Sequence, residues 1–478
     1  MKPLWAMSIR EVSALMQARK VSPLEVVEEA IARTHRYQKS LNPYITFLEE
    51  EARSQAVLLT KNMPKDLENR PLYGIPVGFK DLYCTRGILT TGASRLFSDY
   101  RPEEDATVVT RLKAAGAVNM GKHNLQELAC GATGTASYYG PMRNPYDPAK
   151  ICGGSSGGSA IAVATGMNYL AMGSDSGGSI RIPAAFCGVV GFKPSYGLVS
   201  LHGVMPLSPS LDHGGPLTRS VLDAAIAMDA VTGFDPLDDS PRRYTGKPTA
   251  FAAALEKADR LEGVRVGVPE NFFFDKTEEK TEKLVRKAIS RLQELGARLI
   301  PVSFDFLEEL PELSYVIALW EAARSYRTEL EESGDRMSPF IQKRLQNGAA
   351  ISDTDYEKAT ERRNGITRRW QEIMKTVDVV ACPTVPIPAF PIEGDMQVTV
   401  RGKQEDGLTL CTRHTRLANL TGGPALSVPV GLAEGLPAAL MLMAPGETMR
   451  RCCRWGMCMR SSFLLRSRGF KKAQGEIL

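Results

Sequence analysis

The chain has 478 residues with 43% hydrophobic and 24% charged side chains, and its formal net charge is only +5. Such a composition predicts a globular protein with an extensive core, and it argues against nucleic acid as the main partner because no broad basic field exists. No run reaches the roughly 18 uncharged residues that a membrane helix needs, so we expect no membrane partner. The nine cysteines are dispersed without a CxxC pair or zinc-ligand spacing, which favours reduced thiols in a cytoplasmic protein.

The first 60 residues predict an N-terminal helical arm. Apolar side chains recur at intervals of three and four between Ile9 and Met16, which is typical of a helix with one buried face. Ser22 and Pro23 then supply an N-cap and a first-turn proline for a second helix, which we expect to end at about Tyr37. We interpret this arm, residues 1–60, as a packing element.

Residues 61–240 form the next segment, where glycine, serine, proline and threonine become dense and apolar runs become short. The runs at 117–120 and 170–173 each stand beside a helix-like stretch. This alternation favours a largely buried sheet with helices on its faces. We expect this segment to be the core that holds the chemical motifs.

A β-α-β unit is predicted in the following segment, residues 241–375. Val264–Val268 and Arg298–Val302 are predicted to be strands, and the amphipathic helix between them, Glu278–Leu295, ends at Gly296. The polar, helical remainder, residues 310–375, is expected to cover one side of a cleft. The predicted buried face of the amphipathic helix consists of Leu284, Ala288, Leu292 and Leu295.

Residues 376–446 are expected to return to the core sheet, with late strands at Asp378–Pro383 and Pro424–Val430. Neither an internal repeat nor a low-complexity linker divides the chain. We therefore predict one large α/β domain rather than three separate domains.

Two glycine- and serine-rich runs carry the densest signal for chemistry: GGSSGGS at 153–159 and GSDSGGSIRIP at 173–183. Glycines let the backbone approach a ligand closely and adopt conformations that a Cβ disfavours. In the second run, four successive backbone amides can converge on one point, as the stabilisation of an oxyanion requires. Ser179, at the end of this run, is therefore a candidate nucleophile. The four amides belong to Ser176, Gly177, Gly178 and Ser179.

A serine nucleophile needs a base, and the sequence leaves two kinds of base open. Histidine is scarce, with five in the chain, and no GxSxG nucleophile elbow is present, although a Ser-His-Asp arrangement is compatible with the sequence. Lys80 follows the apolar run 73–79, so we expect it at the end of a buried strand. Burial can lower a lysine pKa from about 10.4 by roughly 3 to 5 units, which produces a neutral amine near pH 7.

Four segments together resemble the amidase signature family of serine amidases: GIPVGFKD, GGSSGGS, GSDSGGSIRIPAAFCGVVGFKPSYG and GPLTRSVLDAA. The similarity extends from the N-terminal helices to about residue 443. It implies the fold of that family, a single domain with a central mixed β-sheet covered by helices. It also implies a Ser-Ser-Lys triad in which Ser179 is the acyl-forming nucleophile, Ser155 relays the proton and holds a cis peptide, and Lys80 is the base. Ser155 lies 75 residues after Lys80 and 24 before Ser179, a spacing that fits the family.

The other polar residues of these runs are expected to support the site. Ser156 is interpreted as a structural, hydrogen-bonding serine, and Asp175 and Arg181 as an ion pair that fixes the loop. GGSSGGS lacks the GK[ST] ending of a P-loop, which argues against a phosphate cradle. Cys187 is interpreted as apolar filling rather than as a nucleophile. His123 and His213 are interpreted as polar lining rather than as ligands.

The sequence therefore predicts hydrolysis of a carboxylic amide through a seryl acyl-enzyme, with release of ammonia or an amine. No metal and no organic cofactor is implied. The expected partner is a small-molecule amide, without direct nucleic-acid contact, and a homodimer is left open. No motif indicates the acyl-chain preference, and the residues that line the substrate site are expected within 310–400.

Within the family, the run at 173–188 is very similar to that of the amidase subunit of the glutamyl-tRNA(Gln) amidotransferase. Three places differ from that subunit: Thr412 replaces a glutamine-binding Asp, Ile182 replaces a Gln, and the stretch 320–326 lacks the substrate-binding Arg of a YDGVRYG-like run. We therefore prefer a stand-alone amidase, with the amidase (glutaminase) subunit of a tRNA-dependent amidotransferase as the alternative. A scaffold protein with a decayed site and an ester-preferring hydrolase are further alternatives.

The tail, residues 447–478, departs from the family and from the rest of the chain. Cys452, Cys453 and Cys458 lie within seven residues among arginines, without an apolar face at helical spacing, where the family has a final helix. A metal cluster is a weak interpretation because a histidine and a second cysteine pair are missing, and a basic membrane- or nucleic-acid-binding tail is another. We favour a change of reading frame, since plausible codons read two bases later spell a helix of the family's type. In that case the tail carries no function, and sequencing the coding DNA tests the hypothesis.

Overall fold

An 11-stranded mixed sheet forms the centre of the computed structural model, which describes residues 2–240, 250–256 and 261–445. Its strand order is β1-β3-β2-β4-β6-β5-β12-β13-β9-β7-β8. β2 is parallel to β3 and β4, and β7 is parallel to β8 and β9, whereas the other pairs are antiparallel. The strands are β1 (Tyr44–Phe47), β2 (Pro76–Lys80), β3 (Val118–His123), β4 (Leu170–Ser174), β5 (Val190–Lys193), β6 (Gly214–Thr218), β7 (Arg265–Pro269), β8 (Arg298–Val302), β9 (Val379–Pro383), β12 (Ala425–Ala433) and β13 (Leu436–Met443).

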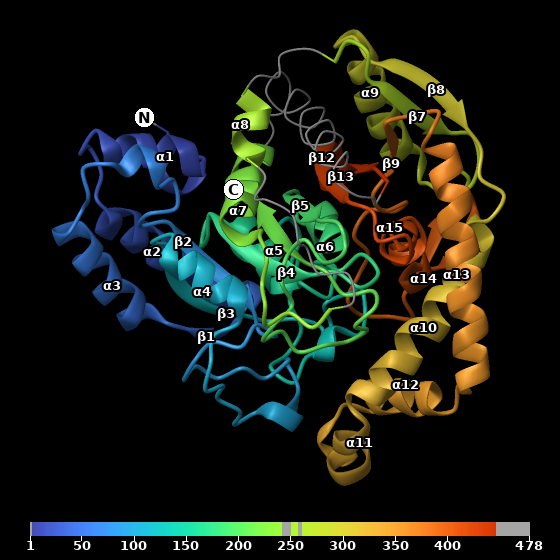
Figure 1. The fold of residues 1–478 in the computed structure, drawn as a ribbon, viewed down its shortest axis with the longest axis horizontal. Coiled ribbons are helices and arrows are strands. Elements are labelled where there is room, and N and C mark those ends of the chain that lie inside the picture. Colours follow the sequence, from blue (N-terminus) through green and yellow to red (C-terminus); the bar gives the residue numbers. More distant parts are fainter. Residues whose placement is uncertain (1, 241–249, 257–260, 446–478) are drawn as a thin grey trace.

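Helices surround this sheet, and a separate hairpin of β10 (Gln397–Val400) and β11 (Lys403–Asp406) lies outside it. Figure 1 shows α1–α3 beside the first strands at one end of the molecule and α9 beside β7 and β8 at the other end. The helices are α1 (Ile9–Gln17), α2 (Pro23–Leu41), α3 (Glu49–Lys61), α4 (Thr107–Ala114), α5 (Gly157–Ala164), α6 (Arg181–Phe186), α7 (Val221–Val231), α8 (Phe251–Glu256), α9 (Glu279–Glu294), α10 (Leu310–Ser325), α11 (Arg327–Ser333), α12 (Pro339–Ala349), α13 (Asp353–Ile373), α14 (Gly407–Arg413) and α15 (Arg416–Leu420).

The predicted fold class is confirmed, since one α/β domain is built on a single large mixed sheet. The predicted second helix is α2, whose N-cap Ser22 accepts from the backbone amide of Glu25 while the Glu25 side chain accepts from the backbone of Ser22. This reciprocal capping box satisfies two backbone donors that a helix start leaves unpaired. The helix ends at Leu41, one turn later than expected. The strands predicted within 264–268, 298–302, 378–383 and 424–430 correspond to β7, β8, β9 and β12.

The buried face of α9 differs from the prediction. Leu284 is only half-buried, and Val285 and Ile289 are buried instead. The helix packs against β9, β12 and β13. This packing buries Val285 and Ile289, which directly follow the predicted Leu284 and Ala288 in the chain. Ala288, Leu292 and Leu295 are buried as expected.

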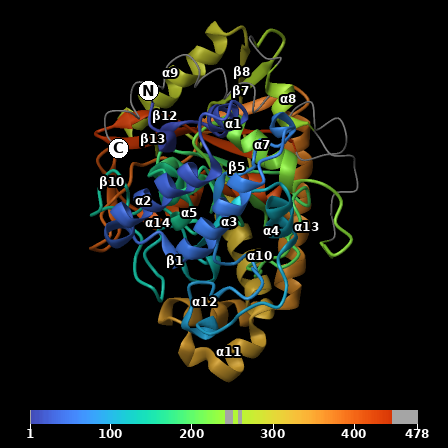
Figure 2. The same ribbon diagram turned by 90° about the vertical axis from the view of Figure 1, so that its left-hand side faces the viewer.

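The segment 310–375 forms four helices, α10–α13, that stand at one side of the molecule. α10 packs against α12, α13 and α15, and Figure 2 shows α10, α11 and α12 at the lower end of the fold. Contrary to the polar character expected of this segment, α10 buries Leu310, Leu313 and Ile317.

None of the helices within the described ranges is both long and apolar enough to cross a lipid bilayer. The hypotheses about the tail, residues 447–478, concern positions that lie outside the described residues.

Candidate active site

Lys80 is the last residue of β2, a strand whose five residues are all buried. The strand lies between β3 and β4 in the sheet, so neighbouring strands flank it on both sides. The Lys80 side chain has no exposed surface. Its amine Nζ is 2.6 Å from the hydroxyl of Ser155 and 2.7 Å from the hydroxyl of Ser174, which ends β4.

The environment of Lys80 favours the neutral amine. Burial lowers the pKa of Lys80 from 10.5 to about 7, although the nearby carboxylates of Asp212 and Asp175 act in the opposite direction. Both hydrogen-bonding neighbours of its nitrogen are neutral hydroxyls. The amine is therefore able to accept a proton near neutral pH.

Ser155 lies in the loop that precedes α5, and the Gly154–Ser155 peptide bond is cis. The loop is held from both sides, because the Gly154 amide donates to the carbonyl of Ala132 at 2.7 Å and the Gln126 amide donates to the carbonyl of Ser155 at 3.0 Å. The Ser155 side chain is fully buried. Its hydroxyl thus meets Lys80 in a fixed position.

Ser156 connects this loop to the nucleophile loop, residues 175–180, which carries the candidate nucleophile Ser179. Its backbone amide donates to the carbonyl of Ser179 at 3.1 Å, and its hydroxyl donates to the carbonyl of Ser174 at 3.1 Å. These are contacts of the structural kind that the sequence suggested. Among the described residues, the Ser155 hydroxyl contacts Lys80 and shares no direct hydrogen bond with the hydroxyl of Ser179.

Asp175 and Arg181 form a fully buried ion pair, with Arg181 Nη2 2.9 Å from Asp175 Oδ1. The Asp175 carboxylate also accepts from the amides of Gly178 at 2.8 Å and Ile180 at 3.1 Å. Burial alone would raise the pKa of Asp175, but the charge of Arg181 and its hydrogen bonds hold that pKa well below the usual value. The ion pair therefore fixes the curvature of the loop that carries Ser179.

One of the four predicted oxyanion amides is already engaged. Because the Gly178 amide donates to Asp175, it is not free to bind a substrate oxygen. The amides of Ser176, Gly177 and Ser179 have no acceptor among the residues that the structure describes. Gly178 serves the loop in another way: its φ is +131°, and a Cβ there would lie 2.4 Å from Thr415 Oγ1.

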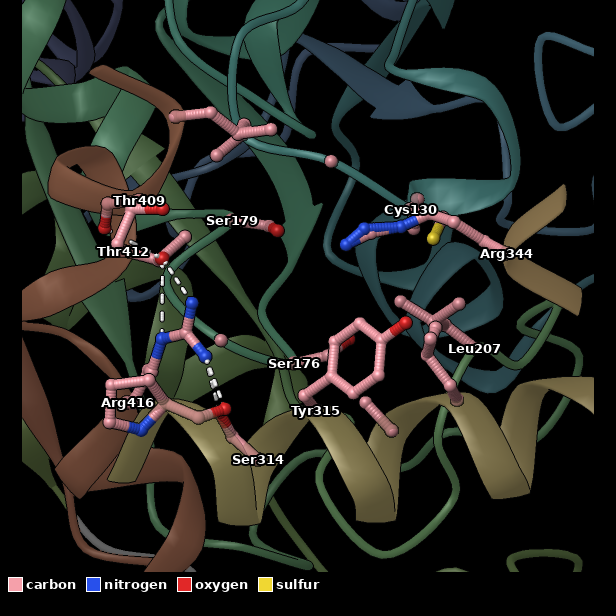
Figure 3. Close-up of a pocket in the computed structure, with 18 of the residues that line it drawn as sticks. Cys130, Ser176, Ser179, Leu207, Ser314, Tyr315, Arg344, Thr409, Thr412 and Arg416 are labelled. Carbon is pink, nitrogen blue, oxygen red and sulfur yellow. Dashed lines mark hydrogen bonds between the residues drawn. The ribbon is translucent and has the colours of Figure 1, made fainter. Parts of the chain in front are cut away.

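Ser179 opens onto a pocket of about 450 Å³. Figure 3 shows its hydroxyl pointing into the interior of this pocket, with Thr412 and Arg416 on one side and Cys130 and Arg344 on the other. The wall comes from four parts of the chain: residues 129–132, the nucleophile loop with residues 182 and 207, the helices α10 and α12, and the stretch 408–416.

The expected location of the lining residues was only partly right. Residues 311–344 line the pocket as predicted, but none from 345–400 does, and the stretches 129–132 and 408–416 were not expected. The fold explains the difference, since α13 packs on the outer side of α10 while α14 and α15 follow the hairpin back to the nucleophile loop.

The structure also adds three residues that sequence reasoning missed. Ser174 is the second hydroxyl on Lys80, and its place in the glycine- and serine-rich run could have indicated it. Asn419 donates from Nδ2 to Asp175 and accepts from Arg181 at 2.7 Å, and it begins the NLTGGP run. Asp212 stands in a loop without a motif, so no signal pointed to it.

Asp212 joins the site through Ser176, whose hydroxyl donates to its carboxylate. The same carboxylate accepts from the amides of Leu207 at 2.8 Å and Ser208 at 3.0 Å. Burial raises the pKa of Asp212 to about 6 against the effect of these hydrogen bonds.

His123 and His213 do not line the pocket, which corrects the prediction. His123 is buried beneath the site and contacts the side chains of Ser159 and Asn168, and burial lowers its pKa to about 4. His213 lies 2.6 Å from the carbonyl of Leu211. Neither histidine contacts Ser179, so neither of the two is placed to act as its base.

Cys187 is fully buried in an apolar cluster, in agreement with its interpretation as filling. Burial raises the pKa of its thiol well above the usual value, which disfavours the reactive thiolate. Across the described ranges, no group of three or more His, Cys, Asp or Glu side chains is placed to hold a metal ion.

A family model and known relatives both match most of the chain. The family model described as Amidase matches residues 25–453. The chain is 36% identical over 462 residues to a subunit of the glutamyl-tRNA(Gln) amidotransferase of Geobacillus stearothermophilus, with 91% of this chain and 93% of the relative covered.

Solved structures are similar over nearly the whole chain. A chain from a vestigial protein complex that reveals the evolutionary origins of an s-triazine catabolic enzyme superposes with a TM-score of 0.88 and 30% identity, covering 97% of this chain and 99% of the other. The native peptide amidase of Stenotrophomonas maltophilia superposes with a TM-score of 0.85 and 27% identity, covering 98% of both chains.

Proposed function

The chain belongs to the amidase signature family and is an amide hydrolase, and from this premise we propose that Lys80, Ser155 and Ser179 are its catalytic triad. The reaction is hydrolysis of a carboxylic amide to the acid and ammonia or an amine. The observation that carries the proposal is the 2.6 Å contact between a buried lysine amine and the Ser155 hydroxyl, next to a pocket into which Ser179 points.

The first half of the reaction acylates Ser179. Neutral Lys80 accepts a proton from Ser155, which accepts the proton of Ser179, and Ser179 Oγ attacks the amide carbon. The amides of Ser176, Gly177 and Ser179 stabilise the oxyanion. When the C–N bond breaks, the proton returns through Ser155 to the leaving nitrogen, and the acyl group stays on Ser179.

The second half removes the acyl group. Water loses a proton along the same relay and attacks the acyl carbon, the bond to Ser179 Oγ breaks, and Ser179 takes the proton back. Products are the carboxylic acid and the restored enzyme. Ser156, Asp175 and Arg181 support these steps by holding the two loops, and no metal or organic cofactor takes part in the proposal.

A second function is favoured by one observation, the 36% identity to a glutamyl-tRNA(Gln) amidotransferase component over most of both chains. On that interpretation the chain is the glutaminase component of such an amidotransferase. Thr412 argues against it, because this residue lines the pocket and holds Arg416 instead of offering a carboxylate to glutamine. Ammonia release that appears only with partner subunits would favour it. A cytoplasmic location and a homodimer stay predictions.

The proposal is tested by replacing Ser179→Ala and treating the protein with a fluorophosphonate probe. We expect turnover to fall by several orders of magnitude and labelling to vanish while thermal unfolding stays near that of the wild type. Ser290→Ala, at an exposed position of α9, is the matched control and should keep both. Substantial turnover or labelling of the Ser179 variant would remove this residue from the mechanism.

A further inference from the structure

Two guanidinium groups line the substrate pocket without a carboxylate partner. Arg344 on α12 and Arg416 at the start of α15 both contribute to the wall. Within the described ranges, neither takes part in an ion pair. The acidic lining residue, Glu312, has a largely exposed side chain and pairs with Arg362 at 3.2 Å. The inner wall is therefore positively charged.

Arg416 is held by neutral oxygens only. Its guanidinium donates to the carbonyl of Pro311 at 2.9 Å and to the hydroxyls of Ser314 and Thr412, each at 2.6 Å. Burial lowers the pKa of Arg416 to about 10, and the charge of Arg344 contributes in the same direction. A buried cation surrounded by dipoles lacks the compensation that a counter-ion provides.

Arg344 has an unsatisfied donor. Its Nε is buried and has no hydrogen-bond partner among the described residues, and its guanidinium lies 5.1 Å from the Phe340 ring centre and 5.9 Å from that of Tyr315. Figure 3 shows the Arg344 guanidinium reaching into the pocket from the wall opposite Ser179. A planar guanidinium with free donors fits a carboxylate in a two-pronged geometry.

We infer that the substrate amide also carries a carboxylate and no ammonium group, and that Arg344 binds this carboxylate while the carboxamide lies at Ser179. Arg416 adds to the positive potential of the same wall. An ammonium group would enter a pocket whose described lining holds two arginines and, as its one carboxylate, Glu312, which is paired with Arg362. This disfavours free amino-acid amides such as glutamine. Apolar residues form much of the rest of the wall, including Ile182, Leu207 and Leu319, so we expect the connecting chain to be hydrocarbon. This inference rests on the proposed function, because it places the reacting amide at Ser179.

A matched set of substrates tests it on the wild-type enzyme. Glutaramate carries the carboxylate, its diamide glutaramide is the neutral isostere, and glutamine is the same skeleton with an added ammonium group. Succinamate and adipamate, with their diamides, cover shorter and longer chains. We expect kcat/KM for the best monoamide to exceed that of its diamide, and of glutamine, by about tenfold or more. Equal kcat/KM for the monoamide and its diamide at all three chain lengths would overturn the inference.

The role of Arg344 is tested with Arg344→Met, which removes the charge but keeps an apolar stem. The preference for the monoamide over the diamide should fall to about one, mainly through a higher KM, while turnover of the diamide persists. Lys343→Met is the matched control, because Lys343 is the exposed neighbour on the same helix and does not line the pocket. It should keep the preference. A preference retained by the Arg344 variant would contradict the inference.

Binding separates this inference from the proposed function. Glutaramate and glutaramide are titrated into the Ser179→Ala protein and into the same protein with Arg344→Met, and heats of binding are measured. Tighter binding of the anion that depends on Arg344 supports the inference even if Ser179 proves dispensable for turnover. Equal binding of the two ligands overturns it, whereas the proposed function stands or falls on labelling and turnover alone.

Discussion

Lys80, the proposed base, carries a penalty for stability. Burial sets the pKa of Lys80 in the folded state at about 7, below its usual 10.5. Between these two values the unfolded chain binds more protons than the folded one, so stability rises with pH across this window. Below pH 7 both states are protonated, and the full penalty of a buried cation is present.

Lys80→Met should therefore lose activity and gain stability. In the wild type we expect kcat/KM to rise through one ionisation near pH 7, because only the neutral amine accepts the proton of Ser155. The variant should lack this limb, and its melting temperature should exceed that of the wild type below pH 7, with the difference shrinking toward pH 10. A flat wild-type profile from pH 5 to 10, together with an active variant, would contradict the role of Lys80.

Asp212 is a positioning residue whose charge acts on Lys80. Since this carboxylate raises the pKa of Lys80, Asp212→Asn should move the limb of the kcat/KM profile to lower pH, by up to about one pH unit. It should also lower kcat, because Ser176 loses its charged acceptor. Full pH profiles of both enzymes measure the effect. Asp239→Asn, at an exposed position, is the control, and a lower kcat with an unmoved limb would reduce Asp212 to a purely structural role.

At this scale, motifs and the family resemblance supplied the proposed reacting groups but not their surroundings. Ser179 and Lys80 could be proposed because each stands in a short run of telling residue types, whereas the role of Ser155 came from the resemblance to the family. Arg344 and Arg416 could not, since they lie on helices far away in the sequence and become pocket residues only through packing. The engagement of the Gly178 amide was equally hidden, because it depends on the direction of the Asp175 side chain.

Among the secondary-structure elements, α5 has the tightest packing next to a reacting group. It starts two residues after Ser155 and is buried along its whole length. A Cβ at Gly158 would lie 2.4 Å from the carbonyl oxygen of Pro43 and 2.5 Å from that of Asn124. Because both neighbours are backbone atoms, the helix reaches this depth only with glycine at that position.

Gly158→Ala should therefore destabilise the protein by about 1–3 kcal/mol and reduce kcat, since α5 must move away and take Ser155 with it. Gly365→Ala in α13 is a matched control, because the nearest atom to its Cβ is 4.0 Å away. It should stabilise the helix by about 0.5–1 kcal/mol with unchanged kcat. Thermal unfolding and steady-state kinetics of the two variants give the comparison. Equal stability of both variants would show that α5 accommodates the added methyl group without a loss of stability.

Hydrophobic periodicity predicted the positions of helices and strands more reliably than it predicted which of their faces are buried. β7, α9 and β8 lie where strand and helix patterns placed them. The buried face of α9 was right at Ala288, Leu292 and Leu295 and wrong at Leu284. Leu284 and Val285 are adjacent apolar residues, and the sheet beneath the helix decides between them. The character of α10 was missed since its burial depends on α12, α13 and α15.

On the scale of the whole molecule, the sheet order assembles the site from distant parts of the chain. β5 pairs with β12, so residues near 190 lie beside residues near 425. This pairing brings Asn419 to the loop of Asp175 and Arg181, 238 or more residues earlier in the sequence. No sequence pattern contains such a register, which is why the late part of the chain was predicted only as core strands.

Asn419→Ala should affect stability and catalysis together. It removes the amide that donates to Asp175 and the oxygen that accepts from Arg181, so two buried charged groups lose a partner at a cost of about 1–3 kcal/mol. We expect kcat to fall as the loop of Ser179 loosens, with a smaller change in KM. Asn364→Ala, at an exposed position of α13, is the control. Denaturant unfolding and kinetics measure both effects. A destabilised variant with full kcat would show that Asn419 does not influence the loop that carries Ser179.

The burial of Lys80 also protects the enzyme from its own chemistry. A neutral amine, rather than an ammonium ion, is the form that cyanate carbamylates and that activated acyl groups acylate. With a pKa of about 7, Lys80 would be readily modified if solutes reached it. Its side chain has no exposed surface, and it is absent from the pocket wall that Ser179 lines. In the proposed mechanism protons reach the amine through the Ser155 hydroxyl, whereas the acyl group stays in the pocket that Ser179 lines. We therefore expect each turnover to end in hydrolysis and not in a permanently amidated lysine.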